Sequence, residues 1–287
     1  MPSRLRSGLI AALRHSDLVQ TPEILGIIAG NGVYPRELAH AARKAGVQKI
    51  VAAAFIDETD RSIEQNADTV EWLRVGQLGR LLKFFRDNAV HLAIMAGQIA
   101  PKNLFDLRPD VKALVVLAKL KQRNAESIFT AIADELKKEN VELLPAVTFL
   151  DDQLASNGLI GGSKLSRAEQ DDVDLGWSIA KEIARLDIGQ TIIVKNGTIL
   201  AVEAFEGTND AIKRGGALAR EGAVMIKVAK PSQDMRFDVP VVGVETVKVA
   251  SEAKLRVIAV EAGKTLLLER DKVIDRAVAA KISLVAR

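Results

Sequence analysis

The chain contains no cysteine, and aromatic residues make up only 4% of its 287 residues. Without cysteine there are no disulfides, no thiolate chemistry and no cysteine-ligated metals, which fits a reducing compartment. The three histidines, His15, His40 and His91, are scattered along the chain, and this disfavours a zinc site. A G-x-S-x-G motif and a Walker lysine motif are missing too, which argues against serine hydrolases and P-loop proteins.

Long apolar runs are also absent. No run reaches the roughly 18 residues that a membrane-spanning helix needs. The short run Gly8–Leu13 is closed by Arg14, which argues against a signal peptide. The formal net charge is only +3, and no series of Lys and Arg is interleaved with aromatic residues, so nucleic-acid binding is not indicated. We therefore expect a cytoplasmic protein that does not bind nucleic acid.

What is present is a globular composition with 48% hydrophobic residues, mainly Ala, Val, Leu and Ile, which favours α/β layering. The length favours two domains. We expect a Rossmann-like α/β domain with a parallel sheet over residues 24–145 and a separate α+β catalytic domain over residues 171–287. Residues 1–23 form an N-terminal extension with the spacing of a short amphipathic helix. Residues 146–170, rich in loop formers, form the connection.

Two glycine turns mark the first domain. Gly30-Asn31-Gly32 follows the expected strand Ile24–Ala29, and Gly97-Gln98 follows the expected strand His91–Ala96. In a parallel sheet, both turns would face one crevice at the carboxyl ends of the strands. The full G-x-G-x-x-G motif is absent, so two interpretations stay open: a dinucleotide site with Asp57 as the ribose-binding acid, or tight turns that need small residues. The other elements expected here are a helix from Pro35 to Ala45, a strand Lys49–Phe55, helices Glu71–Asn88, Val111–Lys121 and Ala125–Asn140, and a strand Val141–Leu144.

The second domain should begin with a helix and continue with short strands. Asn196-Gly197 between two apolar runs predicts a two-residue hairpin, and Gly263-Lys264 predicts another. Thr208 or Asn209 is expected to cap a helix whose free amides attract an anion. The expected strands are Gln190–Val194, Thr198–Val202, Ala223–Ala229, Val239–Val244, Glu245–Val249, Ile258–Val260 and Leu266–Leu268, and the helices are Asp171–Asp187, Ser251–Lys254 and Asp271–Lys281.

Chemistry is expected at two acidic places in the second domain. Asp238 lies close in sequence to Lys230 and Arg236, between two prolines that stiffen the segment, and Glu203 and Glu206 precede the helix. Carboxylates beside cations suit Mg²⁺ and substrate phosphates, so this pattern predicts a phosphate-handling site. The alternative is a solvated connection with incidental charges.

Four segments of the chain then resemble one family in order and length: GIIAGNGVYPRELA, IARLDIGQTIIVKNGTILAVEAFEGTNDAIKR, VAKPSQDMRFDVPVVGVETV and EAGKTLLLERDKVI. Together they are similar to the UDP-2,3-diacylglucosamine pyrophosphatases of lipid A biosynthesis, the type distinct from the calcineurin-like enzymes. The resemblance implies Mg²⁺-dependent attack of water on the substrate's pyrophosphate, which gives UMP and 2,3-diacylglucosamine 1-phosphate.

The resemblance also implies roles for particular residues. Asp238 and Arg236 match the family's R-x-D-x-P motif, whose aspartate is essential. Gln190 and Thr208 match contacts to substrate or metal. We therefore expect Asp238, Arg236 and Lys230 to be catalytic and Asp238 and Glu206 to hold Mg²⁺, and we expect the substrate to be bound by Gly30, Asn31, Gly32, Gly97, Gln98, Gln190 and Thr208.

One segment departs from the family pattern. Many members carry G-x-V-x-R-P after a strand, whereas Gly97–Asn103 lacks the arginine and has Lys102 displaced, and Arg and Lys differ in phosphate geometry. Two other functions stay open: an NAD-type oxidoreductase and a non-catalytic protein that binds acylated sugar nucleotides. We also expect a homodimer and peripheral contact with the cytoplasmic face of the inner membrane.

Overall fold

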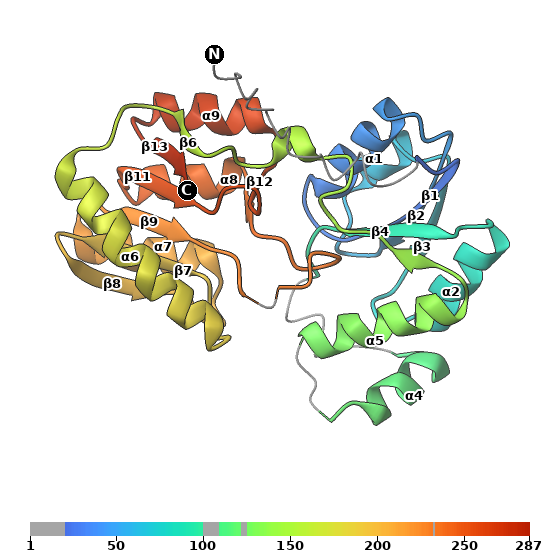
Figure 1. Ribbon diagram of the computed structural model, residues 1–287. Helices are drawn as coiled ribbons and strands as arrows, with labels where there is room; N and C mark the ends of the chain where they lie inside the picture. Colours follow the sequence, from blue (N-terminus) through green and yellow to red (C-terminus); the bar gives the residue numbers. More distant parts are fainter. Residues whose placement is uncertain (1–20, 100–108, 122–124, 232) are drawn as a thin grey trace, which may run out of the picture.

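The computed structural model describes residues 21–99, 109–121, 125–231 and 233–287, which form two α/β domains (Figure 1). Most of the expected N-terminal extension, 1–23, and the Ala100–Asn103 part of the altered segment lie outside the described residues. Figure 1 shows each domain built on its own sheet, with a loop of the second domain reaching toward the first. Within the described ranges, no helix combines the length and the apolar character that crossing a membrane requires.

All strands of the first sheet run parallel, in the order β3-β2-β1-β4-β5. The central strands are buried along nearly their whole length, as expected for a parallel sheet covered on both faces. The order reverses between β1 and β4, which makes a topological switch point there. The expected Rossmann-like sheet is confirmed. Its strands are β1 (Ile24–Ala29), β2 (Lys49–Phe55), β3 (Thr69–Leu73), β4 (Leu92–Ala96) and β5 (Glu142–Leu143).

Helices cover both faces of this sheet, because successive strand residues point to opposite sides. On one face, Ile27 and its neighbours in register pack with the apolar side of α1 and with the 3₁₀ helix η2. On the other face, Ile28 and Met95 pack with three helices. The elements on the first face are α1 (Tyr34–Lys44) and η2 (Arg61–Gln65), and those on the second are α2 (Leu78–Asp87), α4 (Val111–Lys119) and α5 (Ala125–Lys138).

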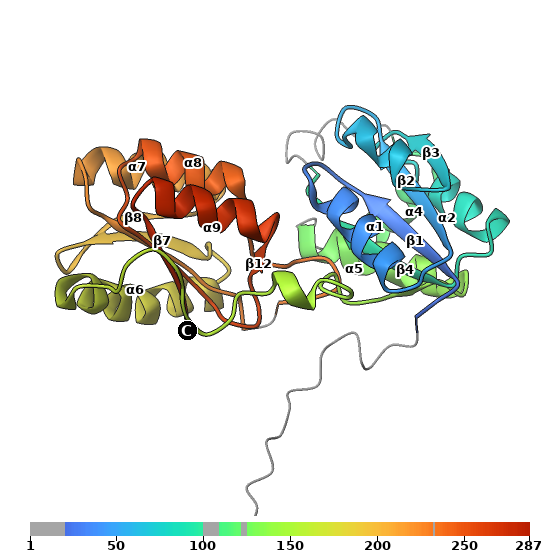
Figure 2. The same cartoon turned by 90° about the horizontal axis from the view of Figure 1, so that it is seen from above.

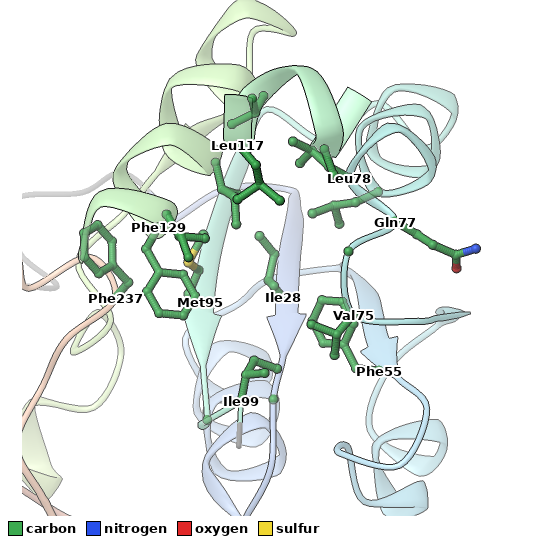
Figure 3. Close-up of a pocket in the computed structure, with 18 residues that line it drawn as sticks. Ile28, Phe55, Val75, Gln77, Leu78, Met95, Ile99, Leu117, Phe129 and Phe237 are labelled. Carbon is green, nitrogen blue, oxygen red and sulfur yellow. The ribbon is translucent and has the colours of Figure 1, made fainter. Parts of the chain in front are cut away.

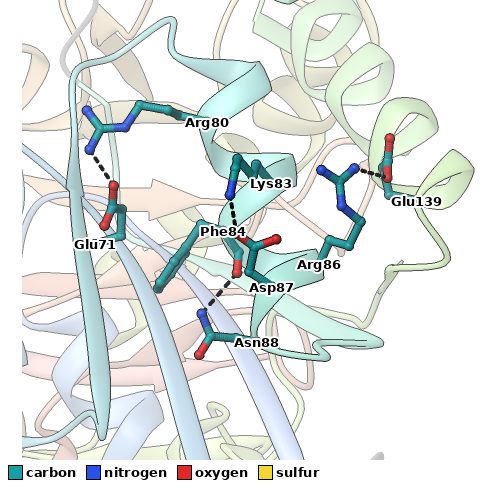
Figure 4. A network of polar contacts seen from close by, with 8 residues as sticks. All are labelled: Glu71, Arg80, Lys83, Phe84, Arg86, Asp87, Asn88 and Glu139. Atoms are coloured by element: carbon teal, nitrogen blue, oxygen red, sulfur yellow. Dashed lines mark hydrogen bonds and ion pairs between the residues drawn. The ribbon is translucent and has the colours of Figure 1, made fainter.

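Helix α2 has an amphipathic surface pattern. Its apolar side, which includes Leu82 and Phe85, is buried. Its outer side carries ion pairs to β3, within the helix and to the end of α5 (Figure 4). The pairs are Arg80–Glu71, Lys83–Asp87 and Arg86–Glu139.

The expectation of one helix over Glu71–Asn88 is wrong in its first part. Residues up to Leu73 belong to β3, which pairs in parallel with β2. Gly76 then adopts φ +99°, and this backbone conformation turns the chain before α2 begins at Leu78. Pairing along the sheet edge outweighs the helical spacing of the apolar residues in this stretch.

The second domain is built on a mixed sheet of order β6-β13-β11-β9-β7-β8. Strands β9, β11 and β13 run parallel, while β6, β7 and β8 join them antiparallel. Helix α6 covers one face and α7, α8 and α9 cover the other, as the view in Figure 2 shows. The strands are β6 (Gly158–Gly161), β7 (Thr191–Lys195), β8 (Thr198–Val202), β9 (Val224–Lys227), β11 (Val257–Val260) and β13 (Ser283–Ala286), and the helices are α6 (Arg167–Arg185), α7 (Thr208–Ala219), α8 (Val244–Glu252) and α9 (Arg270–Ala279).

The turn at Asn196-Gly197 confirms the predicted hairpin between β7 and β8. Both residues have positive φ, 49° and 73°, as a type I′ turn requires. The second predicted hairpin, at Gly263-Lys264, is wrong, because β11 and the strand after this turn belong to different sheets. That strand, β12 (Leu266–Leu267), pairs in parallel with β10 (Val241–Val242).

Other expectations in the second domain also fail. Glu245–Val249 is the first part of helix α8 and not a strand, although it contains β-branched residues. The sequence pattern does not predict strands β6 and β13, and β6 lies in the stretch expected to be a connection. There Gly162 adopts φ +89°, and a Cβ on it would lie 2.8 Å from the Ile282 carbonyl oxygen. Gly162 is therefore packed against the start of β13.

The two domains share part of their core. Leu266 and Leu268 are buried among residues of the first sheet and α1, and Met235, Val239 and Val241 pack against the same cluster. The Ala146 amide donates to the Met235 carbonyl oxygen at 2.7 Å. The segment that contains Asp238 is therefore held against the first domain although it belongs to the second.

Candidate functional site

The switch point of the first sheet is a close crossing of two chain segments. The Asn31 amide donates to the Gln98 carbonyl oxygen at 2.7 Å, and the Gln98 amide donates back at 3.3 Å. A Cβ on Gly30 would lie 2.6 Å from the Gln98 oxygen, and one on Gly97, at φ +93°, would lie 2.6 Å from the Asn31 oxygen. Only glycine fits at both places. The expectation that both turns share one crevice is confirmed.

The same crossing weakens the dinucleotide interpretation. A Rossmann pyrophosphate site needs free backbone amides at the first turn. The Gly30 amide already donates to Ala96 at 2.7 Å, and the Asn31 amide is held by Gln98. Gly32, at φ +90° with open space around its Cα, is the turn residue that leaves room for a ligand. Asp57 is exposed beyond the end of β2.

Beside the crossing lies an apolar pocket between the sheet and helices α2, α4 and α5 (Figure 3). The polar side chain of its lining, Gln77, points away from the cavity and accepts a hydrogen bond from the Arg74 amide at 2.8 Å. None of the described residues that line the pocket is charged. The lining residues are Ile28, Gly30, Phe55, Val75, Gly76, Gln77, Leu78, Leu81, Met95, Gly97, Ile99, Ala113, Val116, Leu117, Ile128, Phe129, Ile132 and Phe237.

One lining residue comes from the second domain. The Phe237 ring lies 5.6 Å from the Phe129 ring of α5, measured between centroids. The next residue in the chain is Asp238, whose amide donates to the Asp234 carbonyl oxygen at 2.9 Å. This turn places an aromatic side chain at the apolar pocket and a carboxylate directly after it.

The two cations predicted beside Asp238 already have partners. Arg236 binds the Asp234 carboxylate through two nitrogens, at 2.6 to 3.2 Å, and lowers the pKa of that carboxyl. Lys230 contacts Asp187 at 2.5 Å. Burial alone would lower the pKa of Lys230, but Asp187, with a smaller contribution from Asp238, raises it overall.

A third lysine, which the sequence interpretation did not include, is buried near Asp238. Lys227 ends β9, and its Nζ donates to Thr208 Oγ1 at 2.7 Å and to Thr191 Oγ1 at 3.4 Å. Burial lowers the pKa of Lys227 overall, and the negative charges of Glu203 and Asp238 offset only part of this shift. Both acids are therefore close enough to this lysine to act on its charge.

Glu203 completes this buried network. The Thr208 hydroxyl accepts from Lys227 and donates to Glu203 Oε1 at 2.9 Å. The other oxygen, Oε2, is buried and has no hydrogen-bond partner among the described residues. Burying a carboxylate oxygen without a hydrogen-bond partner costs free energy. This indicates that a further group binds at this oxygen.

The remaining predicted residues fall around this network. Thr208 begins α7, but it does not cap it: the N-cap is Gly207, and the Thr208 hydroxyl is directed to Glu203 instead. Gln190 precedes β7, and its Oε1 is also buried without a partner in the described part of the chain. Glu206 is exposed and contacts Arg214 at 2.5 Å. Its pKa is lowered by hydrogen bonds from its own amide and from Arg214.

The signal for Lys227 was present in the sequence. It occurs in the run AVMIKVA, where Met225, two residues earlier, faces the core packed by α7 and α8. Because strand residues alternate between faces, Lys227 had to point the same way as Met225. A lysine at a core-facing strand position is rarely buried without a partner, so the pattern indicated a polar network.

For a metal, the donor set is oxygen-rich but small. Within the described residues there is no group of three or more His, Cys, Asp or Glu side chains that could hold a metal ion. The candidates are the unpartnered oxygen of Glu203 and the carboxylate of Asp238, both close enough to affect Lys227. One or two carboxylates plus substrate phosphates is the usual donor set for Mg²⁺, and these residues fit it.

The fold and the site define a two-domain α/β protein with an apolar pocket at a Rossmann switch point, next to a charged loop of the second domain. Residues 24–153 match the LpxI N-terminal domain family, and residues 156–285 match the LpxI C-terminal domain family. The chain is similar to UDP-2,3-diacylglucosamine pyrophosphatase LpxI of Caulobacter vibrioides, with 32% identity over 266 residues, which cover 88% of this chain and 93% of the relative. This chain belongs to the LpxI family.

Proposed function

We propose that this protein hydrolyses the pyrophosphate bond of UDP-2,3-diacylglucosamine and releases UMP and 2,3-diacylglucosamine 1-phosphate. The observation that carries this proposal is the succession of Phe237, which lines the apolar pocket, and Asp238, which lies among lysines. Phe237 thus contacts an apolar space that suits acyl chains, and the next residue, Asp238, lies in a charged region that suits phosphate groups. The name of the Caulobacter relative supports the same substrate.

The apolar pocket suits acyl chains. Its described lining offers no charge and no inward-facing polar side chain, so a nucleotide or sugar would lose most of its hydrogen bonds to water there without replacement. The wetter glycine crossing at its edge, with Gly32 open to solvent, suits the sugar. We assign the acyl chains to the pocket and the diphosphate to the region between Asp238 and Lys227.

In the reaction, water adds to one phosphorus and the bridging P–O bond breaks, leaving two phosphomonoesters. Asp238 orients the attacking water, and Lys227 opposes the negative charge that develops on the phosphoryl oxygens. Thr208 and Thr191 hold the Lys227 ammonium in place. Arg236 and Lys230 can serve the substrate only after exchanging Asp234 and Asp187 for phosphate.

We propose Mg²⁺ as the cofactor. Asp238 and the free oxygen of Glu203 would hold it, and when bound it would supply charge neutralisation at the diphosphate oxygens. Glu206, the second acid that the sequence suggested, would first have to leave Arg214. A homodimer is also part of the proposal, and sedimentation velocity is its test.

The test is UMP release from UDP-2,3-diacylglucosamine with and without Mg²⁺, comparing Asp238→Asn with Asp87→Asn. Asp87 carries the same charge on the outer side of α2 and does not line the pocket. We expect Asp238→Asn to lose at least about 10³-fold in kcat and Asp87→Asn to behave as wild type. Unchanged substrate with the wild-type protein across divalent metals would contradict the proposal. Tight nicotinamide-cofactor binding without hydrolysis would point to an oxidoreductase, and substrate binding without turnover to a carrier.

A further inference from the structure

Helix α4 is apolar on two sides. Its inner side, with Ala113 and Val116 almost fully buried, lines the pocket. Its outer side exposes Val111 (78% exposed), Leu114 (53%) and Val115 (47%). An ordinary surface helix has one apolar stripe and a polar opposite side, as α2 has with its three ion pairs. The outer side of α4 lacks that polar cover.

The position of α4 makes this surface available. Figure 1 shows α4 at the lower edge of the first domain, below α5. It packs on α2 through the pocket side and is tied to α5 by Lys112, which contacts Glu135 at 2.6 Å. The exposed aliphatic side chains thus form an outer surface of the molecule.

The charges beside these side chains are mainly basic. Asp110 is used as the N-cap of α4, where its carboxylate accepts from the Ala113 and Gly79 amides. Lys119 and Lys121 are exposed at the other end of the helix. Exposed aliphatic side chains with exposed lysines at one end of the helix suit the surface of a bilayer that contains anionic lipids.

We propose that the outer side of α4 docks on the surface of a bilayer that contains anionic lipids. Three aliphatic side chains on one short helix fall short of the roughly 1,200 Å² that specific protein–protein interfaces bury, so a second copy of this chain is the weaker occupant. The inner side of the same helix lines the pocket assigned to acyl chains, so docking brings the pocket to the membrane that supplies the lipid. This last step rests on the proposed function, and the docking itself does not.

The first experiment is co-sedimentation with vesicles of phosphatidylglycerol and phosphatidylethanolamine, compared with vesicles of phosphatidylcholine. The test variant is Leu114→Ser/Val115→Ser, whose residues do not line the pocket. The matched control is Leu218→Ser/Val278→Ser, which removes two exposed aliphatic side chains (64% and 49% exposed) from the second domain. We expect wild type and control to bind the anionic vesicles, and the test variant to bind at least tenfold more weakly.

Three outcomes would overturn the docking proposal. The first is equal vesicle binding by the test variant and the wild type, and the second is no binding by either. The third is a dimer-to-monomer change of the test variant in sedimentation velocity with vesicle binding unaltered, which would make this surface a subunit interface.

A second experiment separates docking from catalysis. UMP release is measured with substrate embedded in the anionic vesicles and with substrate dispersed in detergent micelles. We expect the test variant to lose at least fivefold in rate on vesicles and nothing on micelles, because the pocket is intact. Equal rates on both would contradict delivery from the bilayer. If the wild type releases no UMP from either preparation, the proposed function fails, while the vesicle-binding result still decides docking.

Discussion

The two domains both place a site at the carboxyl ends of central strands, but the two sites differ in chemistry. In the first domain, β1 and β4 end at Ala29 and Ala96, each followed by a glycine, and the space left by these small residues is lined with apolar side chains. In the second, β9 ends in Lys227, which is buried and is connected through the Thr208 hydroxyl to the buried Glu203. The residue at a strand's end thus decides whether the position offers empty apolar volume or fixed charge.

Removing the charge of the second site should have the largest effect. We expect Lys227→Met to lower kcat by about 10²–10³-fold with little change in KM, because the lysine acts on charge that develops in the reaction. Its removal also leaves Glu203 buried without a cation, so the double variant Lys227→Met/Glu203→Gln is the folding control. UMP release at saturating substrate, with circular dichroism, is the measurement. A folded double variant with wild-type kcat would show that the buried charge does not act on the reaction.

The small residues at the first site can be tested through stability. Gly97→Ala should lower the free energy of unfolding by about 3 kcal/mol, because its φ is positive and the new Cβ would meet the Asn31 oxygen. Gly32 also has positive φ, but a Cβ there meets nothing within 4 Å, so Gly32→Ala should cost only about 1 kcal/mol. Urea unfolding of both variants separates the cost of the positive φ from the cost of the steric clash. Equal losses of unfolding free energy would mean that the two crossing segments move apart enough to accept the new Cβ.

Making the apolar pocket polar should affect binding more than chemistry. Leu117 lines it, and Leu117→Gln should raise the KM for the diacylated substrate about tenfold with kcat nearly unchanged. Leu186→Gln, at an exposed leucine of the second domain, is the control. A UDP-sugar without acyl chains should bind both variants equally well. An equal increase in KM for that ligand would place the nucleotide, and not the lipid, in the pocket.

The loss of stability at acid pH should come from the second domain, through Glu261. It is the smallest of the expected effects. Burial raises the pKa of Glu261, but Lys181, the Ala229 amide and Lys264 lower it more, so it lies below the usual 4.5. Stability from a lowered carboxyl pKa is fully present above the unfolded value and is lost as the pH falls through the folded value.

Accordingly, Glu261→Gln should cost about 1 kcal/mol at pH 7. Its stability should also fall less steeply than that of the wild type between about pH 5 and pH 3. Urea unfolding across that range is the measurement, with the exposed Glu252→Gln as control. Parallel pH curves for Glu261→Gln and wild type would contradict the role assigned to Glu261.

The sequence predicted the elements whose signals are local. β1 and β2 occur with the expected bounds, and the Asn-Gly hairpin was recognisable because two positive φ angles suit those residues. β3 was not recognised, because its pairing with β2 cannot be seen in the spacing of Glu71–Leu73. Glu245–Val249 was misassigned because β-branched residues are common in strands.

The candidate site was predicted to a similar degree. The two glycine turns do meet, as the sequence predicted. Asp238 and Thr208 were named as site residues from the sequence, and their roles stay predictions. The partners of the cations could not be foreseen: Asp187, which binds Lys230, lies 43 positions away in the chain. The pocket depends on three helices and Phe237 coming together, a tertiary arrangement that no single segment encodes.

The shared core has a consequence for how the chain is made. Leu266 and Leu268 are buried in the cluster that holds β1 and α1 together, and Val241 packs against that cluster. A ribosome releases the first domain long before these residues emerge. During synthesis the first domain therefore keeps an unfinished apolar edge until nearly the whole chain is available, and a chain truncated after residue 153 would keep that edge permanently exposed.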